Sequence, residues 1–257
     1  MTIFPRRGAC WILTLAVATA AQLVSAADEP RFGGKSSALD QLKQGYGAME
    51  EGAYAAAVEH YQAALEFANT RELRFQALVG RGSAEAALDR LADARVSFDR
   101  ALEIKPENPE ALFSAGMVAQ DLKDFAAAAE LLALAAVRDP AFGAAFTQLG
   151  IVYALEGRHE EAAASCRKAV STDPQNVEAQ LCLGVALYQL GRFDQASQAF
   201  DVVVAIDPRN SNARYSLGLC KLYGEDLEGA MREYSVLKDL DPDLARDLHD
   251  RINASRE

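Results

Sequence analysis

The sequence predicts an all-α solenoid of paired helices, because three kinds of residue recur with one period of 34 residues. A fixed period of about 20 to 50 residues indicates stacked structural units and outweighs any local assignment of helix or strand. Prolines keep the step at Pro106, Pro140, Pro174, Pro208 and Pro242, and glycines at Gly82, Gly116, Gly150, Gly184 and Gly218. Alanines keep it at Ala94, Ala128, Ala162, Ala196 and Ala230. Chance does not produce three residue types with one period over five copies.

Each copy has the pattern of two short helices joined by a turn. In the copy 143-176, residues three or four apart line one face of the first helix, at Phe146, Leu149, Gly150 and Tyr153. Gly157-Arg158 ends that helix. The second helix carries a matching face and ends at Asp173-Pro174, because the residue before a proline avoids the α region. Gly150 and Ala162 are small enough to let the two helices approach closely.

The predicted repeats span 38-74, 75-108, 109-142, 143-176, 177-210 and 211-244. The first copy diverges, since Asn69 replaces the proline and three extra residues before Phe75 break the period. Ser37 and Asp40 form a capping box for the first helix. Later helices are capped by asparagines at Asn108, Asn176 and Asn210.

The ends of the array have a different composition. Residues 27-37 contain Pro30, Gly33 and Gly34 and are expected to form a flexible leader. At the other end, Leu244, Leu248 and Ile252 recur every fourth residue, whereas Arg246, Asp247, Asp250 and Arg251 are expected to face elsewhere. Residues 245-257 are therefore predicted to form a capping helix and tail, which the open end of an array requires.

This pattern resembles the tetratricopeptide repeat family over nearly all of the chain after residue 26. The family has a small residue at the eighth position of each copy, Ala at the twentieth and a large apolar residue at the twenty-fourth. Here the twenty-fourth position holds Phe98, Leu132, Cys166, Phe200 and Tyr234. The twenty-seventh holds Ala101, Ala135, Ala169, Val203 and Leu237. The resemblance implies a right-handed superhelical solenoid of six repeats, with the first helix of each repeat on the concave side.

Residues 1-26 are predicted to be a secretory signal peptide. Arg6 and Arg7 form a basic segment, an apolar run follows, and Val24-Ser25-Ala26 supplies the small residues that signal peptidase requires. The alternative is an uncleaved anchor helix, but a span needs about 20 strongly apolar residues, and this run is short and rich in Ala and Thr. We expect a periplasmic or secreted protein of the exported bacterial type, with no membrane anchor after cleavage.

Composition and motifs argue against catalysis and against nucleic acid as a partner. The formal net charge is -11, whereas a phosphate-binding surface needs an excess of Lys and Arg. The sequence has no Gly-rich phosphate loop, no His pair at metal spacing and no nucleophile elbow. His60 and His159 are interpreted as surface or packing residues. We therefore expect no enzymatic activity, no cofactor and no metal.

The cysteines do not form a disulfide framework. Cleavage of the signal would remove Cys10 and leave Cys166, Cys182 and Cys220, an odd number without regular spacing. We expect three buried thiols on helices. One pair could still close in an oxidising compartment, and the sequence does not decide whether it does.

The face of the first helices that the resemblance places on the concave side is apolar and contains no Lys or Arg. Resembling domains that hold chaperone C-terminal tails use a clamp of cations there, so a chaperone tail is excluded as a partner. An apolar trough instead suits an apolar or amphipathic protein segment. The predicted groove residues are Phe113, Met117, Ile151, Leu181, Tyr188, Tyr215, Leu219 and Tyr223. For the smaller ones, packing between neighbouring first helices is an equal alternative.

These observations favour a non-catalytic scaffold or assembly factor for protein complexes of the bacterial cell envelope. Two alternatives stay open. The chain could be a self-associating structural protein, in which one array docks onto another copy. It could also be an accessory subunit that presents substrate to a separate enzyme.

We expect the protein isolated from its native source to begin at Ala27, because the basic segment, the apolar run and the small residues before it form a cleavable signal. Intact-mass measurement checks the start of the chain. A species that retains residues 1-26 would instead indicate a tethered protein.

Overall fold

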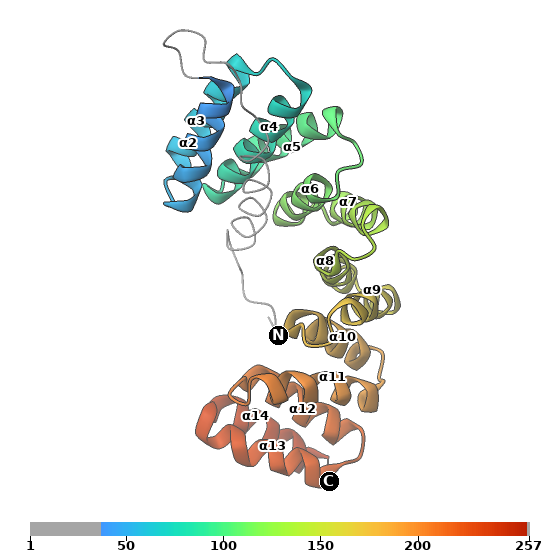
Figure 1. Cartoon of the computed structure of the whole chain (residues 1–257). Helices are drawn as coiled ribbons and strands as arrows, with labels where there is room; N and C mark the ends of the chain where they lie inside the picture. Colours follow the sequence, from blue (N-terminus) through green and yellow to red (C-terminus); the bar gives the residue numbers. More distant parts are fainter. Residues whose placement is uncertain (1–36, 256–257) are drawn as a thin grey trace. The chain divides into compact units, whose positions relative to one another are not determined.

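The computed structural model describes residues 37–255, so the predicted signal peptide and nearly all of the predicted leader lie outside the described residues. The described part consists of α-helices joined by short turns (Figure 1). Within these residues, one compact unit ends at Asp139 and a second begins at Pro140. Each unit is described by itself below.

The first unit contains three helical hairpins. In chain order its helices are α2 (Ala38–Glu50), α3 (Tyr54–Phe67), α4 (Arg71–Ala87), α5 (Leu91–Ile104), α6 (Pro109–Asp121) and α7 (Phe125–Arg138). Within each hairpin the first helix packs along the second, and α3 and α5 each pack on the first helix of the next hairpin. The first helices α2, α4 and α6 also contact one another in order.

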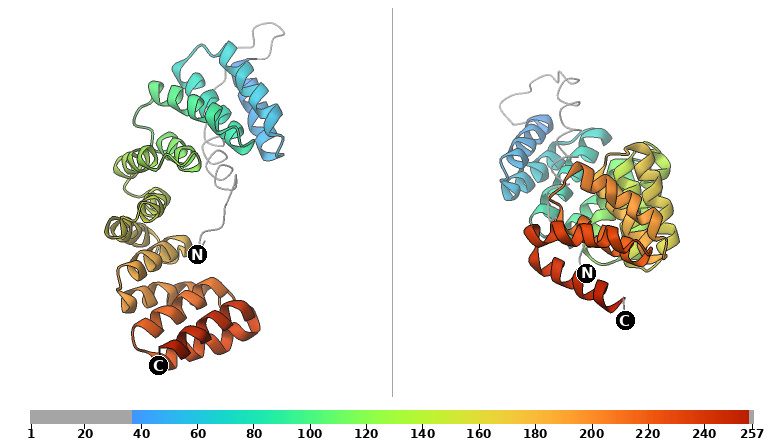
Figure 2. Two further views of the ribbon diagram at one scale, coloured as in Figure 1. Left: turned by 180° about the vertical axis from the view of Figure 1, so that it is seen from behind. Right: turned by 90° about the horizontal axis from the view of Figure 1, so that it is seen from below.

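The second unit repeats this arrangement and adds one helix at its end. Its helices are α8 (Gly143–Leu155), α9 (His159–Thr172), α10 (Val177–Gln189), α11 (Phe193–Ile206), α12 (Ser211–Tyr223), α13 (Leu227–Leu240) and α14 (Pro242–Ala254). The final helix α14 packs against both α12 and α13, as Figure 2 also shows. The predicted all-α fold of helix-turn-helix repeats is confirmed.

The predicted caps and turns are present. Ser37 and Asp40 form the capping box of α2. The side chains of Asn108, Asn176 and Asn210 each accept a hydrogen bond from the backbone N–H three residues ahead, at 2.8 to 3.0 Å. Gly157 lies in the turn between Leu155, where α8 ends, and His159, where α9 begins. Its φ of +75° is a left-handed conformation that favours glycine.

Two helices begin earlier than the sequence pattern indicated. The irregular junction before Phe75 is largely helical, because α4 starts at Arg71 and has 17 residues, against 13 in the other first helices. Thr70 caps it by accepting a hydrogen bond from the backbone N–H of Leu73 at 3.2 Å. The C-terminal helix starts at Pro242, where proline at the first helical position follows the N-cap Asp241.

In four hairpins a glycine of the first helix lies beneath a large side chain of the second helix. A methyl group at Gly82 would lie 3.1 Å from the Phe98 ring, and one at Gly184 would lie 2.8 Å from the Phe200 ring. The same relation joins Gly45 with Tyr61 and Gly116 with Leu132. Gly150 was expected to let the two helices of its hairpin approach closely at Ala162, and a methyl group there would lie 3.2 Å from the Ala162 carbonyl oxygen. At Gly45, Gly82, Gly116 and Gly184 the glycine chiefly makes room for the side chain sixteen residues further along, whereas at Gly218 the space is filled by Leu248 of α14.

The expectation of three buried thiols is corrected at two of the three positions. All three cysteines are buried, but Cys166 and Cys182 are joined by a disulfide, with their Cα atoms 5.8 Å apart, while Cys220 is free. Cys166 lies on α9 and Cys182 on α10, which pack against each other. The two sulfur atoms meet above Gly150, where a large side chain lies in other hairpins. Sequence spacing could not show this pairing, because it joins different repeats.

Gly150→Leu should destabilise the second unit by about 1 to 3 kcal/mol or more, because even a methyl group there would overlap the Cys166 sulfur and lie 2.9 Å from the Cys182 sulfur. Gly224→Ala, at an exposed turn with a φ of −86°, should cost less, because the added methyl group would meet only the Cys220 carbonyl oxygen, at 3.0 Å, and the exposed Asp194 side chain. Denaturant melts of the two variants compare them. Equal losses of stability would show that the positions assigned to the helices and turns of the hairpins are wrong.

Candidate functional site

The structure divides the predicted groove residues by exposure. Phe113 and Met117 lie on α6 of the first unit, and the other six lie on helices of the second unit. Five are buried, with 4 to 6% of their surface exposed: Phe113, Met117, Ile151, Tyr215 and Leu219. Leu181 and Tyr188 are half-buried, whereas Tyr223 is 43% exposed. Burial leaves Tyr188 and Tyr223 as the predicted aromatic residues with accessible rings.

These two tyrosines meet a third ring, and we call Tyr188, Phe193 and Tyr223 the aromatic patch. Tyr188 is in the last turn of α10, Phe193 begins α11 and Tyr223 ends α12. The centroid of the Phe193 ring is 5.6 Å from that of Tyr188 and 5.5 Å from that of Tyr223, and the two tyrosine rings are 6.1 Å apart. Tilted and edge-on contacts at these separations are favourable for aromatic rings. The turn between α10 and α11 therefore carries a half-exposed aromatic surface.

Polar residues of the last helix border this patch. The Tyr215 hydroxyl donates a short hydrogen bond to Asp247 Oδ2, and Arg251 Nε donates to the same oxygen at 2.7 Å. Arg251 Nη1 also lies 3.5 Å from the Tyr223 hydroxyl oxygen. Asp247 and Arg251 lie off the apolar face of the capping helix, as expected, with about half of each side chain exposed, but they also have protein partners. Both contact tyrosines of α12, because α14 packs along that helix.

The environment shifts the pKa values of these groups in opposite directions. Burial, together with the hydrogen bond to Asp247, raises the pKa of Tyr215 to about 12. The hydrogen bonds from Arg251 and Tyr215 lower the pKa of Asp247. At neutral pH the tyrosine is thus a neutral donor and the aspartate an anion paired with Arg251. The positive charge of Arg251 beside the aromatic patch is therefore paired with the negative charge of Asp247.

Sequence reasoning missed Phe193 as well as the two residues of α14. A signal for Phe193 was present, because the first residue of each second helix is large in every regular copy, namely Leu91, Phe125, His159, Phe193 and Leu227. No signal identified Asp247 or Arg251, since only the packing of α14 decides which of its charged residues turn towards α12.

The other candidate groups show no reactive arrangement within residues 37–255. No group of three or more His, Cys, Asp or Glu side chains there could hold a metal ion. His60 Nδ1 lies 2.9 Å from the Gln41 side-chain oxygen, and His159 begins α9. Burial raises the pKa of the Cys220 thiol to about 12, so it is protonated at neutral pH and a poor nucleophile. The aromatic patch is suited to recognition.

Family models decide the classification. Two models described as tetratricopeptide repeat match residues 42–109, 113–177 and 153–217. The chain belongs to the tetratricopeptide repeat family. Proteins of this family bind protein partners and are generally non-catalytic interaction modules. No curated protein sequence matches the chain.

Solved tetratricopeptide repeat structures share this fold. YrrB, described as having an unusual peptide-binding site, is 25% identical with a TM-score of 0.66, and the match covers 76% of this chain and 98% of YrrB. A tetratricopeptide repeat protein from Parabacteroides merdae is 17% identical with a TM-score of 0.67 over 86% of this chain and 88% of its own. MamA from Desulfovibrio magneticus is 22% identical with a TM-score of 0.60 over 67% and 96%. The last two likenesses concern the fold alone.

Tyr215→Ala should destabilise the second unit by about 3 kcal/mol or more, because its ring packs in a buried cluster with Leu219, Leu248 and Ile252. Tyr223→Ala should cost less than about 1 kcal/mol, since its side chain is 43% exposed. Urea unfolding of both variants measures the difference. Similar losses in stability would mean that Tyr223 is also a core residue.

Proposed function

We propose that this protein is a non-catalytic scaffold or assembly factor of the bacterial cell envelope, which holds an apolar or amphipathic segment of a partner protein. The observation that carries the proposal is the aromatic patch. Its rings are held in place by their contacts with one another, yet Tyr223 remains 43% exposed. A rigid aromatic surface loses little conformational freedom when a partner binds.

The chemistry of the patch favours a largely uncharged segment. Tyrosine and tryptophan dominate the energetic centres of protein interfaces because they combine a large apolar surface with a polar group. The Tyr223 hydroxyl at the edge supplies that polar group, and Arg251 beside it is paired with Asp247. Apolar contact with the rings and hydrogen bonding at the edge would together recognise an amphipathic segment.

The likeness to YrrB supports peptide binding. That protein is described as having a peptide-binding site, and 98% of it matches this chain at 25% identity. The same fold thus binds a peptide in another protein of the family, and we propose that it does so in this chain. In this chain the partner segment would contact the aromatic patch, because the rings of the patch are partly exposed.

The envelope location rests on the signal-like residues 1-26, and it remains a prediction. We likewise propose that nucleic acid and chaperone tails are not partners. The grounds are the net charge of -11 and the lack of Lys and Arg on the predicted concave face of the first helices. No helix within residues 37–255 is long and apolar enough to cross a membrane.

Tyr188→Ala and Tyr223→Ala should each weaken partner binding by roughly 2 kcal/mol, because hot spots are typically aromatic residues in desolvated positions. The partner would be identified by co-purification with the tagged full-length chain, and binding then measured by titration calorimetry. Added salt should have little effect, since Arg251 beside the patch is already paired with Asp247 and Arg192 in the same turn with Glu160.

Tyr234→Ala is the matched control, because Tyr234 lies in the same unit but stacks on His249 at 4.8 Å between ring centroids, outside the aromatic patch. It should leave the affinity unchanged. Unchanged affinity in the Tyr188 and Tyr223 variants, or strong weakening by salt, would place recognition elsewhere. Oligomers of the pure protein in sedimentation would favour the self-associating alternative.

A further inference from the structure

A second surface lies in the first unit, where α3 and α5 form the walls of a groove and α4 forms its floor. We call it the outer groove, because its walls are second helices of neighbouring hairpins. Its volume is about 490 Å³. Val58, Glu59 and Glu66 line it from α3, Arg81 from α4 and Val96 from α5. The groove exists because α3 and α5 both pack on α4, so the space between the two walls is left open.

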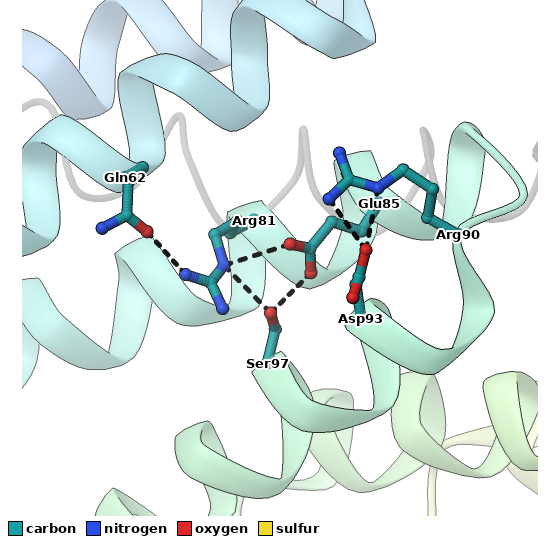
Figure 3. A network of polar contacts seen from close by, with 6 residues as sticks. All are labelled: Gln62, Arg81, Glu85, Arg90, Asp93 and Ser97. Atoms are coloured by element: carbon teal, nitrogen blue, oxygen red, sulfur yellow. Dashed lines mark hydrogen bonds and ion pairs between the residues drawn. The ribbon is translucent and has the colours of Figure 1, made fainter.

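The floor of the outer groove is a fixed polar network (Figure 3). Arg81 Nε lies 3.3 Å from Glu85 Oε1 and donates to Ser97 Oγ at 3.0 Å, and Ser97 Oγ donates to the second Glu85 oxygen at 2.5 Å. Arg81 Nη1 donates to the Gln62 side-chain oxygen at 2.6 Å. Glu85 is only 3% exposed. The charge of Arg81 is therefore cancelled within the floor.

Packing alone does not require these charges. The residues at the position of Arg81 in the later repeats are apolar, namely Ala115, Leu149, Leu183 and Leu217. A buried ion pair is often no more stabilising than apolar residues of similar volume, because both ions lose their hydration. The second repeat therefore lacks an apolar contact that the later repeats have. Its polar network instead holds the side chains of Arg81 and Gln62 in one conformation at the surface of the groove.

The walls carry a net negative charge. Arg90 pairs with Asp93 at 2.8 Å, just as Arg81 pairs with Glu85. Glu59 and Glu66 are exposed and have no ion-pair partner in the part of the chain that the structure describes. They lie seven residues apart, hence on one face of α3 and separated by about 10 Å along its axis. On the α5 wall, Val96 exposes 53% of its surface.

We propose that the outer groove binds a basic amphipathic helix of a partner protein. Cationic side chains seven residues apart in that helix would pair with Glu59 and Glu66, and an apolar side chain between them would pack on Val58 and Val96. Charge complementarity selects this occupant over a second copy of the chain, whose formal net charge is -11. The surface is separate from the aromatic patch, which belongs to the second unit.

The test uses the full-length chain and a fluorescein-labelled, alanine-rich helical peptide. The peptide carries two lysines at the spacing of Glu59 and Glu66 and a leucine midway between them. Fluorescence anisotropy at low ionic strength should show binding that weakens as salt is added, because exposed ion pairs are screened. A peptide with both lysines replaced by glutamate should not bind.

Paired variants separate the groove from general charge attraction. Glu59→Lys with Glu66→Lys should weaken binding at least about tenfold, since two attractive pairs become repulsive. Asp99→Lys with Glu103→Lys makes the same change in net charge at exposed positions of α5 that do not line the groove, and it should change the affinity less than about twofold. Val96→Ser should also weaken binding, because it removes the apolar contact without changing the charge of the groove.

Three results would overturn the proposal: no binding of the basic peptide, equal weakening by the two double variants, or loss of binding in the Tyr188→Ala, Tyr223→Ala variant. The last result would assign the peptide to the aromatic patch. Circular dichroism verifies that each variant is folded, and Glu59→Gln with Glu66→Gln replaces the lysine pair if that variant unfolds. Since the two surfaces use different residues, failure here leaves the proposed scaffold function standing.

Discussion

The contact between one glycine of a first helix and the group that packs over it, a large side chain in most hairpins, is the constraint on which the rest of the structure depends. Phe98 above Gly82 and Phe200 above Gly184 bring the two helices of a repeat together. Because a repeat packs only on its neighbours, the array has no central core that could compensate for a badly filled hairpin. The same few positions are therefore spent on packing in every copy, and recognition must use the positions that remain.

Much of the fold could be predicted because it follows from interactions within a single repeat. Asn108 caps the helix that starts at the next residue, and Gly157 provides the positive φ of the turn that follows α8. Such interactions join residues a few positions apart, so the sequence contains both partners side by side. The fold class and the caps were predictable for this reason, although the exact starts of α4 and α14 depended on local capping by Thr70 and Asp241.

Contacts between repeats could not be predicted in the same way. The Cys166–Cys182 disulfide, the hydrogen bond from Tyr215 to Asp247 and the burial of Tyr215 all depend on how one hairpin is rotated against the next. A helical pattern shows which residues share a face, but it does not show which residue of the neighbouring helix meets them. Only part of the candidate site could therefore be predicted from the sequence. Its tyrosines followed from the helical pattern, whereas Phe193, Asp247 and Arg251 were identified only in the packed structure.

Both candidate surfaces occur where a copy departs from the pattern of the others without a gain in packing. Arg81 stands where the later repeats have apolar residues and forms a buried pair with Glu85 at a desolvation cost, and Tyr223 leaves part of a large ring in water. A solenoid selected for stability alone would favour neither arrangement. The two departures also differ in chemistry, because the aromatic patch offers rings beside a neutralised cation and the outer groove offers unpaired carboxylates. Neither proposed surface shares a residue with the other, so variants of one leave the other intact.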